Sequence, residues 1–403
     1  MSTSVLYHGF GVRGYVCLRV DYVEGAIVFT IAQERENLRC PCCGTSRVER
    51  RGEVPRMIQV LPVGSKRVSV FLRVARVSCK RCGIVRQVKV QFADEHRRYS
   101  RSFERYVLEL SRNMTIAAVA AHLQIGWDAV KEIQRRHLQK HYARPKLKHL
   151  EEIAIDEVYV GRNQYLTVVL DLNSGAVVFV GNGKGAEALL PFWKRLRASK
   201  AKIKAVAADM SRAYTKAVRQ HLPQAVLVYD RFHIVKLFNE KLTDLRRELY
   251  REATAGLHRD VLKGIRWLLL KNPENLDSKK GEWERLNEAL ELNSSLFVAY
   301  YMKEQLRLFW EQPEARTARR FFNDWIQLAE ASGIKILMKF AKTLAAHREG
   351  ILAWYEHPLS TGPLEGTNNK IKTMKRQAYG FRDLDFLKLK ILAIHQATYA
   401  LVG

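Results

Sequence analysis

The order of strand-like and helix-like segments in the middle of the chain is the feature that most constrains its fold. Apolar, partly β-branched runs predict three successive strands at residues 152–159, 165–170 and 176–180. The pattern then alternates, which predicts helix, strand, helix and strand at residues 185–199, 203–209, 212–221 and 225–229. Three strands in succession, followed by helices and strands in alternation, predict one mixed sheet in an α+β protein.

This is the element order of the ribonuclease H-like fold, in which the fourth strand lies parallel beside the first. The right-handed crossover rule permits that placement. It would set Asp156, in the first strand, beside Asp209, at the end of the fourth. Glu157 competes with Asp156, but neighbouring residues of a strand face opposite sides, so we expect Glu157 to face away. The alternative is that each is an ordinary surface carboxylate.

A third carboxylate, Glu365, lies at the start of a late helix, which a Thr-Gly-Pro sequence at residues 361–363 indicates. The helical period predicts a packed face made of Leu364, Thr367, Ile371, Met374 and Ala378. It predicts a second, polar face made of Glu365, Asn368, Asn369 and Lys372.

Adjacent carboxylates repel one another unless cations neutralise their charge. Their hard oxygen ligands suit Mg²⁺ or Mn²⁺. Two such ions, about 4 Å apart, would activate the attacking oxygen of a phosphodiester reaction and stabilise the leaving one. We therefore predict that Asp156, Asp209 and Glu365 share a two-ion site.

The stretch at residues 239–355 has a helical pattern and contains five of the seven tryptophans, most of which we expect to pack in a core. An all-helical insertion would explain the long gap between Asp209 and Glu365. Asp230 and His233 follow the last core strand, beside the proposed site. They could contact the scissile phosphate or a flipped base, or could be a capped helix start with a buried histidine.

Two Cys-x-x-Cys-Gly knuckles stand near the N-terminus, and their cysteines are Cys40, Cys43, Cys79 and Cys82. This spacing lets each turn aim two thiolates at one tetrahedral ion, which predicts a structural Zn²⁺. Cys42 could replace Cys40, and Cys17 is expected to be a small core residue. Strand patterns at residues 16–31, 54–63 and 67–77 complete a small zinc-binding β module. Buried, metal-free cysteines are the alternative.

Three short helices are predicted next, at residues 102–112, 116–123 and 127–141, with caps at Ser102 and Thr115. Small apolar residues and a short Gly turn suit helix-turn-helix packing. The last helix carries the cations expected to contact DNA, namely Lys131, Arg135, Arg136 and Lys140. A basic linker follows at residues 144–149. The alternative is a solvated helix pair that joins two domains.

The charge balance points to a polyanionic partner. Lys and Arg number 68 against 41 Asp and Glu, a net charge of +27 in 403 residues. Nucleic acid is the favoured partner and a membrane surface the rival, although no apolar run is long enough to span a bilayer. The clustered cysteines and the lack of a signal-like N-terminus predict a reducing compartment.

The chain resembles the ISL3 family of insertion-sequence transposases. Four pairs of stretches carry the resemblance: residues 40–44 with 79–83, 119–123 with 127–130, 155–157 with 208–214, and 365–372 with 376–381. The resemblance implies a zinc-binding head, a helix-turn-helix and a DDE domain whose triad is Asp156, Asp209 and Glu365. The Asp230 and His233 pair also resembles a motif of several DDE families, and we expect His233 to take part in catalysis.

The resemblance implies a division of the chain into five segments. These are a zinc-binding β domain, a helix-turn-helix domain with linker, the first part of a ribonuclease H-like core, an all-helical insertion and the last part of the core, at residues 1–95, 96–150, 151–238, 239–355 and 356–403. Further DNA contacts are expected from the late helix, at Asn369, Lys372, Lys375 and Arg376.

The implied reaction has two steps, with no covalent protein–DNA intermediate. Metal-activated water hydrolyses the DNA at the element end, and the resulting 3′-hydroxyl attacks target DNA. The N-terminal domains would bind terminal inverted repeats in a homodimer or larger assembly, in the bacterial cytoplasm at the nucleoid. One rival is a non-catalytic DNA-binding regulator derived from a transposase. Another is a nuclease that cuts without joining.

Overall fold

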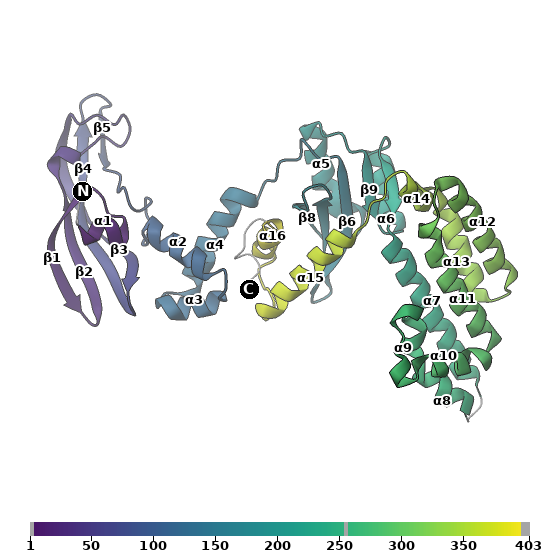
Figure 1. The fold of residues 1–403 in the computed structure, drawn as a ribbon. Helices are drawn as coiled ribbons and strands as arrows, with labels where there is room; N and C mark the ends of the chain where they lie inside the picture. Colours follow the sequence, from purple (N-terminus) through teal and green to yellow (C-terminus); the bar gives the residue numbers. More distant parts are fainter. Residues whose placement is uncertain (1–3, 254–256, 396–403) are drawn as a thin grey trace. The chain divides into compact units, whose positions relative to one another are not determined.

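The computed structural model describes residues 4–253 and 257–395, and the chain divides into two compact units. The first unit contains Met1–Arg144 and Ile371–Gly403, and the second contains Pro145–Lys370. Figure 1 follows the chain from the N-terminal sheet, in purple, to the late helix, in yellow. Among the described residues, no helix is both long enough and apolar enough to cross a membrane.

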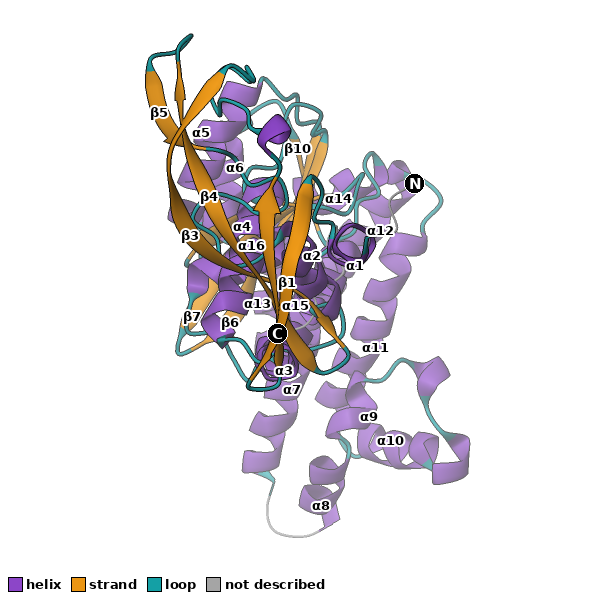
Figure 2. Ribbon diagram, turned by 90° about the vertical axis from the view of Figure 1, so that its left-hand side faces the viewer, coloured by secondary structure: helices purple, strands orange, loops and turns teal. Residues whose placement is uncertain are grey.

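A five-stranded sheet forms the N-terminal part of the first unit, after a short helix, α1 (Val5–Phe10). Its strands are β1 (Tyr15–Val23), β2 (Ala26–Gln33), β3 (Val48–Val63), β4 (Lys66–Cys79) and β5 (Ile84–Gln87). They lie in the order β1-β2-β4-β3, with β5 also paired to β4 (Figure 2). Alternate β4 residues are buried, which fits the alternating pattern of the sequence. The β3–β4 hairpin was predicted from the turn at residues 62–65 and is confirmed.

Three helices follow: α2 (Arg101–Leu110), α3 (Ile116–Leu123) and α4 (Trp127–Tyr142). Thr115 caps α3 as predicted, because its side chain accepts from the Ala118 amide at 3.1 Å. The cap of α2 was predicted one turn position too late: Ser100, not Ser102, accepts from the Phe103 amide. The first unit closes with α16 (Leu384–Leu392), whose Phe386 is buried with Leu138 of α4.

The second unit contains the other five-stranded sheet, in the order β10-β9-β6-β7-β8. Its strands are β6 (Glu152–Gly161), β7 (Gln164–Asp171), β8 (Val177–Asn182), β9 (Ala205–Ala208) and β10 (Val226–Tyr229). The first three are antiparallel, and β9 runs parallel to β6, as the sequence predicted. One face of this sheet is covered by α5 (Leu190–Ser199) and α6 (Arg212–His221), which bury Trp193 and Tyr214 against β6.

Helices occupy the chain between β10 and residue 355. They are α7 (Arg231–Glu252), α8 (Leu257–Gly264), α9 (Arg266–Leu270), α10 (Glu282–Glu291), α11 (Ser294–Leu308), α12 (Ala315–Ala331), α13 (Lys335–Ala346) and α14 (Arg348–Leu352). Figure 1 shows them, in green, as a bundle beside the β10 edge of the sheet. Here α14 packs so closely on β10 that a Cβ at Gly350 would lie 2.5 Å from the Tyr229 ring.

Most tryptophans of this bundle are packed, as predicted. Trp310 and Trp325 are buried, whereas Trp267 is 65% exposed and is the exception. The long helix α15 (Gly362–Gln377) then starts in the second unit, where Leu364, Thr367 and Asn368 are buried.

Candidate active site and zinc centre

The four knuckle cysteines meet at one point. The sulfurs of Cys40, Cys43, Cys79 and Cys82 all lie within 4.8 Å of one another. The Cys43 and Cys79 sulfurs are 3.7 Å apart, which matches the edge of a tetrahedron with Zn–S bonds of about 2.3 Å. The four-thiolate set therefore fits Zn²⁺, and the structure chooses Cys40 over Cys42 as the ligand.

The backbone explains how each knuckle aims its sulfurs. The Gly44 amide donates to the Cys40 carbonyl and the Gly83 amide to the Cys79 carbonyl, at 3.0 and 2.8 Å. Both glycines have positive φ angles, of 73° and 67°, which a residue with a Cβ rarely adopts. A hydrogen bond from the Cys43 backbone lowers the pKa of the Cys40 thiol to about 7, so the thiolate that binds metal forms readily.

The two remaining cysteines lie outside this centre. Cys42 is exposed, which agrees with its surplus place in the first knuckle. The expectation that Cys17 is a small core residue is wrong. It lies on β1, whose residues are mostly exposed, and its own side chain is exposed.

Asp156 and Asp209 are brought together by strand register. In the parallel ladder Ala154 pairs with Ala207, so the same register places Asp156 opposite Asp209, just beyond the end of β9. Burial raises the pKa of Asp156, the charge of His233 lowers it, and the negative charge of Asp209 raises it further. These carboxylates are therefore close enough to sense each other, and a cation between them would relieve both effects.

Asn368 of α15 contacts this pair directly, and its side chain was placed wrongly from the sequence. The helical period put it on the polar face, but it is 6% exposed and its Nδ2 donates to Asp156 Oδ2 at 2.8 Å. Its Oδ1 is buried and has no hydrogen-bond partner among the described residues. A buried amide oxygen without a partner, beside a carboxylate, is an available ligand or acceptor.

Glu365 is exposed and lies in the first turn of α15, one turn before Asn368. Within the described part of the chain, the cysteines are the one group of three or more such side chains close enough to share an ion. The Glu365 carboxylate is therefore not within that distance of both aspartates in this structure.

Asp230 has a different partner from those considered in the sequence. It is 2% exposed, and its carboxylate accepts from the Thr361 amide at 3.3 Å and from the Thr361 hydroxyl at 2.5 Å. The Glu365 amide in turn donates to the Thr361 carbonyl at 2.8 Å. Asp230 thus holds the start of α15, and neither contact with DNA nor a side-chain cap of α7 is its role here.

The remaining carboxylate, Glu157, faces the other side of the sheet as expected. It accepts a hydrogen bond of 2.7 Å from the Tyr214 hydroxyl of α6, and that hydroxyl also lies 3.2 Å from Thr167 Oγ1. This network occupies Glu157 away from Asp156.

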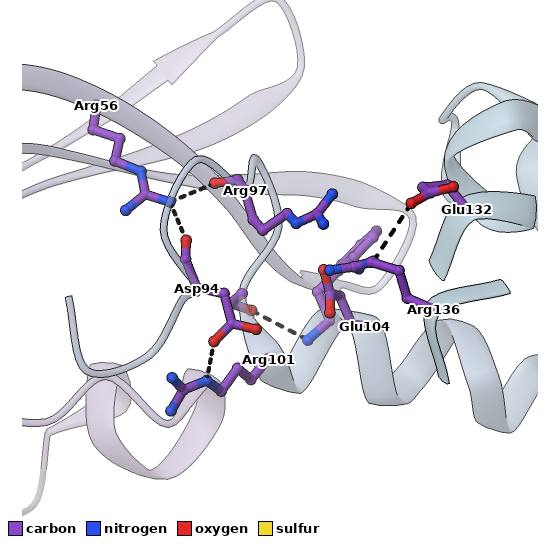
Figure 3. Close-up of polar contacts among 9 residues, drawn as sticks. Arg56, Asp94, Arg97, Arg101, Glu104, Glu132 and Arg136 are labelled. Atoms are coloured by element: carbon purple, nitrogen blue, oxygen red, sulfur yellow. Dashed lines mark hydrogen bonds and ion pairs between the residues drawn. The ribbon is translucent and has the colours of Figure 1, made fainter. Parts of the chain in front are cut away.

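The cations of α4 are mostly engaged within the first unit. Asp383, which precedes α16, forms ion pairs with both Lys131 and Arg135, and Phe386 lies under both cations. Arg136 pairs with Glu104 of α2 at 2.6 Å (Figure 3), so Lys140 is the exposed one of the four. On the late helix Asn369, Lys372 and Arg376 are exposed and Lys375 is half-buried.

Three family models match the chain in chain order. One described as a transposase matches residues 153–391, the helix-turn-helix domain of transposase family ISL3 matches 88–138, and the zinc-finger of the IS204/IS1001/IS1096/IS1165 transposases matches 36–82. The first match alone covers more than half of the chain. The chain belongs to the ISL3 transposase family. The prediction of a DDE transposase is thereby confirmed.

Relatives within the family align over nearly their whole length. The transposase of insertion sequence element IS1001 from Bordetella parapertussis is 32% identical over 393 residues, 95% of this chain and 96% of that protein. The transposase of IS1557 from Mycobacterium tuberculosis is 29% identical over 409 residues, 94% of this chain and 91% of that protein. The solved Drosophila P element transposase strand transfer complex matches at 8% identity over 73% of this chain and 93% of that one. Its TM-score of 0.39 is too low to carry an argument.

Proposed function

We propose that this transposase binds the terminal inverted repeats of an insertion sequence, cuts the element ends by hydrolysis and joins the freed 3′-hydroxyl to target DNA. The observation that carries the proposal is the register of β6 and β9, which pairs Asp156 with Asp209 at one sheet edge in a chain of this family. The element order and the strand order support a ribonuclease H-like core, with α7–α14 as an all-helical insertion. The five segment boundaries given above are part of the proposal.

The site residues take the following roles in it. Asp156 and Asp209 hold Mg²⁺ or Mn²⁺, which would supply the charge that stabilises the attacking and leaving oxygens. Glu365 is the third carboxylate, because residues three apart on a helix are neighbours and Asn368 already touches Asp156. His233, whose charge reaches Asp156, contacts the scissile phosphate.

Asn368 orients the Asp156 carboxylate through its amide nitrogen. With Oδ2 fixed by that bond, Oδ1 of Asp156 is left to face the cations. Asp230 is a positioning residue, since it acts through Thr361 on the helix that carries both Glu365 and Asn368.

The zinc centre and the helix-turn-helix hold the DNA end, together with Lys140 and the cations of α15. Joining two ends requires at least a dimer, and the reaction belongs to the bacterial cytoplasm, where the nucleoid supplies the target.

Strand cleavage and joining with labelled end DNA and Mg²⁺ test the proposal. Asp209→Ala should lose both steps and keep DNA binding. Glu151→Ala is a matched control, because this exposed carboxylate, paired with Lys204, lies at the opposite end of β6. Equal cleavage by Asp209→Ala and the wild type would remove Asp209 from the site. Cleavage without joining would favour a nuclease, and binding without cleavage a regulator.

A further inference from the structure

A groove of about 740 Å³ crosses the zinc-binding sheet on the side of β5. It is lined by the ends of β3, β4 and β5 and by the segment that leads to α2. Six cationic side chains line it, and one carboxylate, Glu95, does so too. The cations are Arg56, Arg76, Arg86, Lys89, Arg97 and Arg98.

These cations differ from the others of the same sheet in having few acidic partners. The remaining carboxylates pair outside the groove: Glu49 with Arg51 and Lys80, Glu53 with Arg50 and Arg73, and Asp94 with Arg101. Among the described residues, no carboxylate lies within ion-pair distance of Arg76, Arg86, Lys89 or Arg98. Four exposed, uncompensated cations in one concave surface repel one another unless an anion lies between them.

The groove is also rigid. Arg56 donates to the carbonyls of Asp94 and Arg97, at 2.6 and 2.7 Å, and so fixes the loop that forms one wall (Figure 3). The Gln59 amide donates to the Arg98 carbonyl at 2.8 Å, and the Val88 amide to the Ala75 carbonyl at 2.9 Å. A wall built in this way loses little conformational freedom when a ligand binds.

We propose that this groove is a second DNA-binding surface, which holds the phosphate backbone of duplex DNA apart from the helix-turn-helix. A duplex presents a regular ridge of phosphates, which suits a concave row of cations. Met57 and Val85, which are 51% and 48% exposed, provide apolar contact for the sugars between phosphates. The inference rests on the proposed function, since it places the DNA that a transposase must hold.

The test compares two charge-matched double variants of the full chain in duplex binding without Mg²⁺. Arg86→Ala with Lys89→Ala removes two groove cations. Lys66→Ala with Arg67→Ala removes two exposed cations at the tip of the β3–β4 hairpin. Zinc content and circular dichroism establish that both fold. A third protein, Arg86→Lys with Lys89→Arg, keeps the groove charges.

The groove variant should bind duplex DNA about tenfold more weakly at physiological salt and lower the slope of log K against log salt by about 2, one per lost phosphate contact. The hairpin variant and the charge-keeping variant should stay near the wild type. Equal losses in both double variants would overturn the proposal, because net charge alone would explain them. No loss, or a loss for single strands only, would overturn it too.

The outcome separates this proposal from the proposed function. If the groove variant binds normally and the wild type still cuts and joins end DNA, only the groove assignment fails. If the wild type neither binds nor cuts end DNA, the function itself fails.

Discussion

Asn368 shows how much a single side chain at the DDE site contributes. Its Nδ2 is the observed partner of Asp156, at 2.8 Å, and its Oδ1 is buried without a partner in the described part of the protein. Removal of such an orienting group around a metal ligand commonly costs about 10- to 100-fold in activity or metal affinity. The amide therefore belongs to the machinery that the three carboxylates alone do not define.

We predict that Asn368→Ala lowers the rate of strand cleavage by about 10- to 100-fold and raises the Mg²⁺ concentration needed for half-maximal rate. DNA binding should not change, because the residue is buried. Gln377→Ala, at the exposed end of the same helix, is the control and should cleave like the wild type. A normal rate and normal Mg²⁺ dependence for Asn368→Ala would show that its bond to Asp156 has no role in the reaction.

At the scale of elements, α16 and α4 are joined by a charged contact as well as an apolar one. Burial would raise the pKa of Asp383, but the hydrogen bonds from Lys131 and the Phe386 amide and the charge of Arg135 lower it to about 2. Asp383 is also the cap of α16, since its side chain accepts from the Phe386 amide at 3.0 Å. One carboxylate thus starts a helix and fixes it to its neighbour.

Asp383→Ala should lower the free energy of unfolding by about 1–2 kcal/mol, the value of a lost cap with its ion pairs. Asp383→Asn keeps the cap and should cost less. Because the folded pKa lies below the ordinary value, the charge contribution is complete above about pH 4 and is lost as pH falls toward 2. Urea unfolding of both variants and of Asp385→Asn, whose exposed carboxylate pairs with Lys388, measures this. A gap between wild type and Asp383→Asn that does not narrow at low pH would contradict it.

Sequence patterns predicted the elements well where each depends on local periodicity or spacing. The strands, the parallel placement of β9 beside β6 and the two knuckles are of this kind. Three features depended on contacts between residues far apart in the chain: Asn368 with Asp156, Asp230 with Thr361, and Asp383 with Lys131. A helical wheel divides a helix into two faces, but Asn368 lies at the border, where tertiary packing decides which way it points.

The DNA-contacting surface was only partly predictable for the same reason. Seven cations in and after α4 pointed to a recognition helix, yet Lys131 and Arg135 are occupied by a carboxylate about 250 residues later in the chain. The groove cations lie on three strands and one loop, so no single stretch of sequence displays them together. A net charge of +27 predicts a polyanion but not the face that binds it.

For the whole molecule, the zinc centre is a long-range staple. It joins the turn before β3 to the end of β4 across 36 residues, and so holds the sheet that carries the basic groove. A bound metal stabilises the folded state by its binding free energy, because the unfolded chain has no preformed site. Loss of one thiolate should therefore weaken both metal retention and the DNA-binding surface.

We predict that Cys43→Ser and Cys82→Ser each lose the single bound Zn²⁺, melt at a lower temperature and bind duplex DNA more weakly. Cys42→Ser and Cys17→Ser change exposed thiols outside the cluster and should retain zinc, stability and binding. Metal analysis, thermal melting and DNA binding on all four proteins make the comparison. Zinc retained at full occupancy by Cys43→Ser would mean that another ligand, such as the adjacent Cys42, replaces it. The double variant Cys42→Ser with Cys43→Ser would then separate substitution by a neighbour from a centre that does not depend on this knuckle.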